Sequence, residues 1–184
     1  TISDNGAVYI DETSDLIISN GSEAGNEVNV ESAGQLVVRG DVDATSFIST
    51  SNLNFKAGAV LGVGGELTID NSVIEDSLNI VLDNGLSSST SHWDTSEMYI
   101  GDETRNNSLT LTNGATATAA GDIVYIGNKS TASGNSINVY GSNSLLTAQD
   151  KVLVGSGGDN NSLNLSEGGS ATVWLDLKVG VSSG

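Results

Sequence analysis

The chain of 184 residues lacks cysteine and proline, and it has only 6 basic residues against 23 acidic ones. Without cysteine it can form neither a disulfide framework nor a thiolate metal site. The net charge of −17 disfavours binding to nucleic acid and to anionic membranes, because both are negatively charged. The same charge favours solubility of a chain rich in β-strands. Nucleic acid is therefore not an expected partner.

Long apolar runs and aromatic residues are also scarce. No stretch of the sequence approaches the roughly 18 consecutive apolar residues that a membrane-spanning helix requires. No transmembrane segment is therefore expected. The chain starts at Thr1 and ends on Val179–Gly184, where another repeat would begin. We expect the natural protein, or its assembly, to continue beyond one or both of these ends.

What the sequence does contain is a repeat, in which an apolar residue, a small polar residue and a second apolar residue recur six times. The first residues of these triplets lie 25, 25, 31, 28 and 26 positions apart. A period of this length, built from short strand-like segments, is typical of a solenoid whose repeats stack on one another. The triplets are Val28–Val30, Leu53–Phe55, Leu78–Ile80, Leu109–Leu111, Ile137–Val139 and Leu163–Leu165.

The repeats between Asn107 and Gly180 each contain three short strands. Each repeat opens with Asn-Ser, runs through an apolar strand and a turn rich in Gly, Asn and Ser, and continues into a strand of small residues. A third strand follows an Asp and ends on Gly, as at Val124–Gly127. Three strands and three corners per repeat predict one coil of a right-handed, single-stranded parallel β-helix. We expect an all-β solenoid of about seven coils of ~25–28 residues, forming a single domain over residues 1–184.

The two-residue period of a strand assigns each position to the interior or to the surface. The apolar residues of each triplet point inward, so its central polar residue points outward. Stacked amide side chains can hydrogen-bond from one coil to the next, as they do in cross-β ladders. We therefore predict a structural ladder in one outward column, formed by Asn29, Asn54, Asn79, Thr110, Asn138 and Asn164.

The best-defined repeats resemble those of a known group of surface proteins. Residues 107–115 read Asn-Ser-Leu-x-Leu-x-Asn-Gly-Ala and precede Tyr125–Gly127, while residues 135–142 read Asn-Ser-Ile-x-Val-x-Gly-Ser and precede Leu153–Gly155. This frame resembles the repeat of autotransporter (type V secretion) passengers and PEP-CTERM-associated surface proteins. The resemblance is good over residues 97–180 and fainter over 1–96. It implies a secreted, surface-displayed β-helix, and it implies no catalytic residues.

The one histidine, His92, precedes Trp93 and Asp94 in the segment where the spacing between triplets is longest. We predict that this segment is a loop leaving the coil, in which an exposed His92–Trp93 pair could stack on a sugar ring. The alternative, which we favour, is that Trp93 folds back onto the apolar flank of the coil. A single histidine with no nucleophile motif argues against a Ser-His-Asp triad.

Three acidic turns are the candidates for a cation site: Asp4–Gly6, Asp41–Asp43 and Asp102–Glu103. Their oxygen ligands would suit a hard cation such as Ca²⁺. They lack the Gly-Gly-x-Gly-x-Asp nonapeptide of calcium-binding β-rolls, so solvated corners are the favoured interpretation. No cofactor is therefore expected.

These features favour a non-catalytic extracellular structural or adhesive β-solenoid on the bacterial cell surface, with copies that can assemble end to end into a filament. A polysaccharide or protein of the cell surface or matrix is the other expected partner. The alternative is a carbohydrate-active or carbohydrate-binding β-helix, such as a polysaccharide lyase or depolymerase, because carboxylates on neighbouring coils could flank a sugar. The six basic residues occupy different positions of the repeat and do not converge on one predicted patch, which argues against a lyase.

Overall fold

A computed structural model describes residues 6–10, 16–17, 28–30, 34–39, 41–44, 53–55, 60–69, 73–74, 79–86 and 90–180. The regular structure in these ranges is almost entirely β-strand, and every strand pairing in them is parallel. The helical content of the same ranges is one short 3₁₀ turn, η2 (Asn84–Leu86). Parallel neighbours along a single chain require a crossover between them, and here the crossovers are themselves strands.

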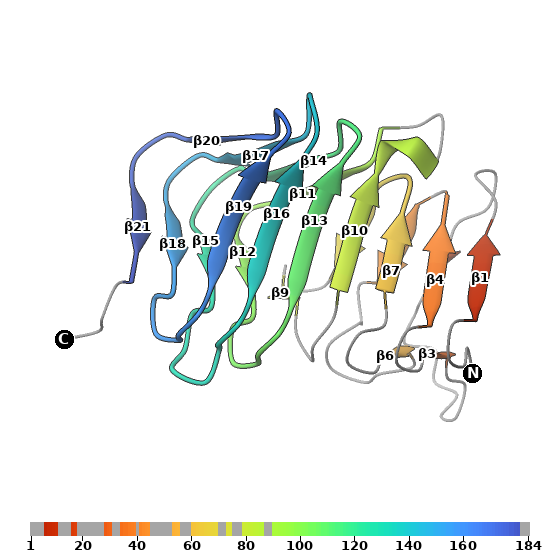
Figure 1. The fold of residues 1–184 in the computed structure, drawn as a ribbon, viewed down its shortest axis with the longest axis horizontal. Helices are drawn as coiled ribbons and strands as arrows, with labels where there is room; N and C mark the ends of the chain where they lie inside the picture. The colour runs from red at the N-terminus through yellow and green to blue at the C-terminus, as the bar shows by residue number, and fades with distance from the viewer. Residues whose placement is uncertain are drawn as a thin grey trace.

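The strands wind into coils, because every third strand returns to the same sheet. The 21 described strands follow one another as seven triplets, and the first strand of each triplet lies in one seven-stranded sheet. Figure 1 shows this sheet running from β1 at one end of the molecule to β19 at the other. Its order is β1 (Ala7–Ile10), β4 (Gln35–Val38), β7 (Val60–Val63), β10 (Asn79–Asp83), β13 (Ser108–Thr112), β16 (Ser136–Tyr140) and β19 (Ser162–Ser166).

The second and third strands of the triplets form the other walls, and each wall is interrupted once. The second strands make a four-stranded sheet of β11 (His92–Thr95), β14 (Thr116–Ala119), β17 (Leu145–Ala148) and β20 (Ser170–Val173), and a three-stranded sheet of β2 (Leu16–Ile17), β5 (Val42–Ala44) and β8 (Leu67–Ile69). The third strands make a five-stranded sheet of β9 (Val73–Ile74), β12 (Met98–Ile100), β15 (Val124–Ile126), β18 (Val152–Val154) and β21 (Leu177–Val179), and the pair β3 (Val28–Val30) and β6 (Leu53–Phe55). The fold is a parallel β-helix, as the repeats predict.

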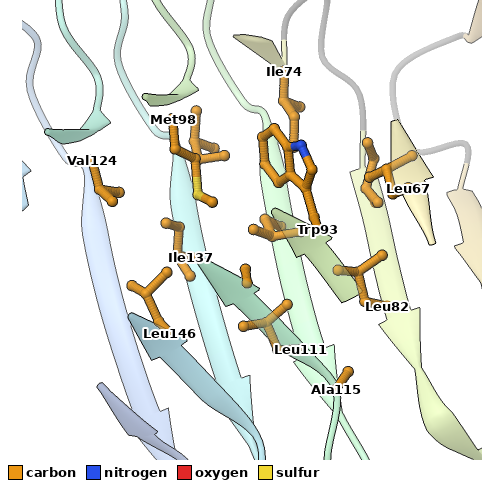
Figure 2. Close-up of a cluster of buried hydrophobic side chains, with 14 of the residues drawn as sticks. Leu67, Ile74, Leu82, Trp93, Met98, Leu111, Ala115, Val124, Ile137 and Leu146 are labelled. Carbon is orange, nitrogen blue, oxygen red and sulfur yellow. The ribbon is translucent and has the colours of Figure 1, made fainter. Parts of the chain in front are cut away.

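The core is a column of apolar side chains enclosed by the three walls. Alternate residues of each strand point into it, so Leu109 and Leu111 of β13 stack on Ile137 and Val139 of β16, and all four are fully buried. The buried cluster extends from Leu36 to Val154 and is drawn in part in Figure 2. No coil can bury its apolar side chains alone, so each coil depends on its neighbours for stability.

In the first half of the chain, the triplets do not form the strand of the coil that the sequence predicts. Val28–Val30 and Leu53–Phe55 are the third strands of their coils and pair with each other, so they do not belong to the seven-stranded sheet. The triplet at Leu78 is also displaced, because β10 begins at Asn79 and pairs Ile80 with Leu109. The reason is that coil length varies, since the step from the start of β7 to the start of β10 is much shorter than the step from β10 to β13. A triplet with the same letters therefore occurs on different strands of different coils.

Candidate functional site

The predicted outward ladder is present across the last three strands of the seven-stranded sheet. Thr110, Asn138 and Asn164 are in register on β13, β16 and β19. Asn138 Nδ2 donates to Thr110 Oγ1 at 3.3 Å, and Asn164 Nδ2 donates to Asn138 Oδ1 at 2.8 Å. Each amide also donates to the serine two residues earlier on its own strand, at 3.4 Å from Asn138 and 3.1 Å from Asn164. These side chains join neighbouring coils on the outer surface.

The prediction of one continuous column of six is wrong. Asn79 is in register with Ser108, which donates to its Oδ1 at 2.7 Å, and Val81 occupies the position next to Thr110. A shift of two residues keeps Asn79 on the outer face but moves it to the neighbouring column. Asn29 and Asn54 pair through their backbones in the separate sheet of β3 and β6, and their side chains lie outside what the structure describes.

A second asparagine ladder, which the sequence analysis does not identify, lies inside the corner that precedes the seven-stranded sheet. Asn107, Asn135 and Asn161 each open a coil, directly before β13, β16 and β19. The Oδ1 of Asn135 accepts the backbone N–H and the Nδ2 of Asn107, both at 2.9 Å. The Oδ1 of Asn161 accepts the same two groups of Asn135 at 2.8 Å and 3.1 Å. The motif therefore repeats unchanged from one coil to the next.

Because the inner ladder is buried, each of its polar groups requires a hydrogen-bond partner within the protein. Asn107 and Asn135 are buried, and a buried amide without partners would cost roughly 1–3 kcal/mol for each group left unsatisfied. Asn135 Nδ2 also donates to the carbonyl of Thr104 at 3.2 Å, and Asn161 Nδ2 donates to the carbonyls of Ala132 and Gly158 at 2.9 Å. Among the described residues, no buried side-chain nitrogen or oxygen lacks a hydrogen-bond partner.

Glycine at the end of the third strand makes room for this ladder. Gly101 and Gly127 each have φ of 75°, a conformation that favours glycine. A Cβ built on Gly101 would clash with the side chain of Asn135, and one on Gly127 would clash with that of Asn161. The paired signal, a strand-ending Gly and an Asn-Ser that opens a later repeat, is therefore present in the sequence. The glycine and the Asn-Ser pair, each taken alone, indicate only a turn, because Gly, Asn and Ser are the common turn residues.

The prediction of an exposed His92–Trp93 loop is wrong for Trp93. Residues 92–95 form strand β11, in which alternation points His92 outward and Trp93 inward. The indole is only 1% exposed, and Figure 2 shows it among core side chains that include Leu67, Ile74 and Met98. The favoured alternative, in which Trp93 packs against apolar side chains of the coil, agrees better with this position. The indole does not cover the flank of the coil, however, but lies in the core itself. His92 stays on the outer surface, with its Nε2 4.0 Å from a carboxylate oxygen of Glu66.

The acidic turns are held by bonds within the protein. Asp41 Oδ1 accepts the backbone N–H of Glu66 at 2.8 Å. Asp102 accepts Asn128 Nδ2 at 2.5 Å, and its other oxygen lies 3.5 Å from Lys129 Nζ. No group of three or more metal-ligating side chains comes together among the residues that the structure describes. Asp4 and Asn5, of the predicted turn Asp4–Gly6, lie outside the residues that the structure describes.

The outer face of the third wall carries a stacked tyrosine pair. The rings of Tyr99 on β12 and Tyr125 on β15 are 4.8 Å apart between centroids and 5° from parallel. Burial and the nearby Glu97 raise the pKa of Tyr99 to about 12, and the Tyr99 hydroxyl donates to Glu97 Oε2 at 3.4 Å. Burial also raises the pKa of Tyr125. Leu153 and Lys178 continue this column on β18 and β21.

At the C-terminal coil, inward positions of the core columns are exposed. Leu165 is 48% exposed, Leu177 is 55% exposed and Val179 is 72% exposed. Their register partners one coil earlier, Val139, Val152 and Val154, are buried. The first strand shows the same feature, since Val8 of β1 is in register with buried Leu36 and is 43% exposed. Both end faces of the described structure therefore present apolar side chains.

No helix in the described part of the chain has the length and apolar character needed to cross a membrane. Taken together, the described residues form a parallel β-helix with two side-chain ladders, an aromatic pair and apolar side chains at both end faces.

Comparisons with protein-family models, with curated proteins and with solved structures find no match to this chain.

Proposed function

We propose that this chain is a non-catalytic structural or adhesive module, displayed outside the cell on the bacterial surface. The observation that carries the proposal is the pair of asparagine ladders, which join coil to coil through side chains in addition to the backbone pairing. Such doubly joined coils resist local opening, since separating two coils would leave buried amides without partners. A rod of this kind serves as a spacer or scaffold, and its surface provides contacts.

The second wall supplies a surface for adhesive contacts. Thr118, Thr147 and Thr172 form one outward column on β14, β17 and β20, and Asp94 on β11 precedes them. None of the side-chain hydrogen bonds found among the described residues involves these three hydroxyls. In contrast to the amides of the outer ladder, they remain able to bond a polysaccharide or a protein partner.

Composition and the resemblance of the repeats support the extracellular location. The chain has no cysteine, a net charge of −17 and abundant Ser, Thr and Asn, which suit a β-rich surface exposed to water. The repeat frame over residues 97–180 is similar to that of autotransporter passengers and PEP-CTERM-associated surface proteins. Association between copies belongs to the same proposal, because a scaffold built from short rods requires contact between their ends.

The test is to locate the natural protein and to probe its surface. An antibody against this chain should label intact cells, and protease added to those cells should remove the label while cytoplasmic proteins survive. Labelling only after the cells are permeabilised would overturn the extracellular location. Incubation of the purified chain with a panel of polysaccharides should yield no new reducing ends and no unsaturated products. Turnover of any of these polysaccharides would replace the proposal with a carbohydrate-active function.

A further inference from the structure

Two tyrosines on the outer face of the third wall lie close enough to be joined covalently. We propose that Tyr99 and Tyr125 form a dityrosine cross-link when the chain meets a one-electron oxidant, such as a haem peroxidase supplied with hydrogen peroxide. The new bond joins two successive coils through their side chains. This modification goes beyond the proposed function and does not depend on it.

The backbone places the two side chains on the same side of one sheet. Tyr99 is the central residue of β12 and Tyr125 is the central residue of β15, and the two residues pair in register. The residues that flank each tyrosine are buried in the core, so alternation along the strand points both rings outward. Each of the two strands has a further neighbour, β9 beside β12 and β18 beside β15, so the pair lies in the interior of the sheet.

The two rings are held at a separation that suits coupling. Their centroids are 4.8 Å apart and their planes are 5° from parallel, and this separation is close to that of two aromatic rings joined by a single bond. Rotation about the Cα–Cβ and Cβ–Cγ bonds converts the stack into an edge-to-edge arrangement. Both side chains are partly exposed on the outer face, where such a rotation does not disturb the packed core. Radicals formed on these rings are held together by the strands and couple without a diffusive encounter.

The cross-link forms by loss of one hydrogen atom from each phenol. The oxidant takes one electron from each ring and the hydroxyl proton leaves, so that two phenoxyl radicals result. The unpaired spin lies partly on the ring carbons beside the hydroxyl, and one such carbon from each ring forms the new C–C bond. The hydrogen on each of these carbons then moves to the phenol oxygen and restores the aromatic ring. One molecule of hydrogen peroxide is reduced to water for each cross-link.

A carboxylate beside the pair accepts the proton that oxidation releases. The hydroxyl of Tyr99 donates to Glu97 Oε2 at 3.4 Å. Burial and the charge of Glu97 raise the pKa of Tyr99 to about 12, and burial followed by the charge of Asp122 raises the pKa of Tyr125. Both phenols therefore keep their protons at neutral pH, and loss of an electron is easier where a base takes the proton.

The other two tyrosines of the chain have no tyrosine beside them. Tyr9 lies on β1 and Tyr140 lies on β16, with β4, β7, β10 and β13 between them in the first sheet. The column of Tyr99 and Tyr125 continues with Leu153 on β18. The four tyrosines of the chain should therefore give one cross-link within a molecule.

The experiment treats the purified full chain, at low concentration, with hydrogen peroxide and a haem peroxidase and then isolates the monomer. Trypsin cleaves each tyrosine into a separate peptide, because a basic residue stands between every two of them. The expected product is residues 57–105 joined to residues 106–129, with dityrosine fluorescence and a mass lower by two hydrogen atoms than the two peptides together.

Variants that keep the aromatic ring identify the partners. Tyr99→Phe and Tyr125→Phe should each lose the joined peptides, and either one serves where the other does not fold by circular dichroism. The double variant Tyr9→Phe/Tyr140→Phe is the matched control and should keep them. A folded wild-type chain that gives no such product, or dityrosine that occurs only between molecules, overturns the inference.

Unfolding the chain before oxidation tests whether the fold brings the rings together. A photochemical one-electron oxidant acts in urea as well as in buffer, and the yield of the joined peptides should fall severalfold in urea. Equal yields would overturn the inference. The cross-linked monomer should also unfold at a higher urea concentration than the untreated chain, because the link restricts the unfolded state. An unchanged midpoint would overturn the joining of the two coils. Failure of this test leaves the proposed function standing, since that function is tested on intact cells.

Discussion

The side-chain oxygen of Asn161 accepts two hydrogen bonds from Asn135, one from its backbone N–H at 2.8 Å and one from its side-chain amide at 3.1 Å. Asn135 offers the same oxygen to the same two groups of Asn107. Asn135 thus satisfies the backbone of the coil before it with one atom and is itself satisfied by the coil after it. Stability in this region is shared between coils, so the loss of one amide affects two neighbours.

Asn135→Ala is therefore expected to lower the free energy of unfolding by about 3 kcal/mol, because the Asn107 backbone N–H loses its acceptor in a buried site and the Asn107 amide keeps only its bond to Thr104 Oγ1. Asn164→Ala is the matched control. It removes an exposed amide of the outer ladder and should cost less than about 1 kcal/mol. Urea unfolding of both variants measures the difference. Equal effects would show that the inner ladder contributes no more than the outer one.

Gly127→Ala should also be destabilising, for two reasons that a control can separate. A residue with a side chain is strained at φ of 75°, by about 1–2 kcal/mol, and its Cβ would clash with the Asn161 side chain. Gly180 has φ of 67°, but no neighbouring atom lies within 4 Å of the place that a Cβ would take, so Gly180→Ala tests the strain alone. The midpoint of urea unfolding should fall further for Gly127→Ala. Indistinguishable midpoints would contradict close packing of Asn161 against Gly127.

Trp93→Ala should remove a large part of the core where the first and second halves of the solenoid meet. The indole is fully buried, and its deletion leaves a cavity that costs about 4 kcal/mol. His92→Ala, at the neighbouring position on the outer face, is expected to change stability by less than about 0.5 kcal/mol. Denaturant unfolding of the two variants checks both values.

Fluorescence gives an independent check on the position of Trp93. The other tryptophan, Trp174, is 64% exposed, so Trp174→Phe leaves Trp93 as the only tryptophan emitter. Its emission should be blue-shifted and poorly quenched by acrylamide in the folded chain. Efficient quenching would place the indole on the surface, as the loop interpretation does.

The second half of the fold can be predicted from the sequence because its coils are regular. The first strands of the last three coils begin at Ser108, Ser136 and Ser162, which are nearly evenly spaced, so the same letters fall on the same strand. In the first half the step from Val60 to Asn79 is much shorter. Local alternation of apolar and polar residues still predicts strands there. It carries no information on which of the three walls a strand joins, so the position of each triplet within its coil cannot be predicted.

The inner ladder and the place of Trp93 escape sequence analysis for different physical reasons. Asn107 and Asn135 stand beside serines in turn-rich segments, where asparagine ordinarily caps or turns the backbone. The close packing of Asn135 depends on a contact with the glycine of another coil, which no local pattern reports. Trp93 is the only large apolar residue of its strand, His-Trp-Asp-Thr, so the two-residue alternation that marks a half-buried strand is too weak to recognise.

The last prediction concerns alkaline pH. The folded-state pKa of Tyr99 is raised to about 12 from an ordinary value of 10.0, first by burial and then by the charge of Glu97. The folded chain therefore binds this proton more tightly than the unfolded chain, so the stabilisation is fully present below pH 10 and is lost as the pH rises towards 12. Tyr99→Phe should flatten the fall in unfolding free energy over this window, and phenolate absorbance should show one late-titrating group fewer. An unchanged pH dependence in Tyr99→Phe would contradict the raised pKa of Tyr99 and the burial that causes it.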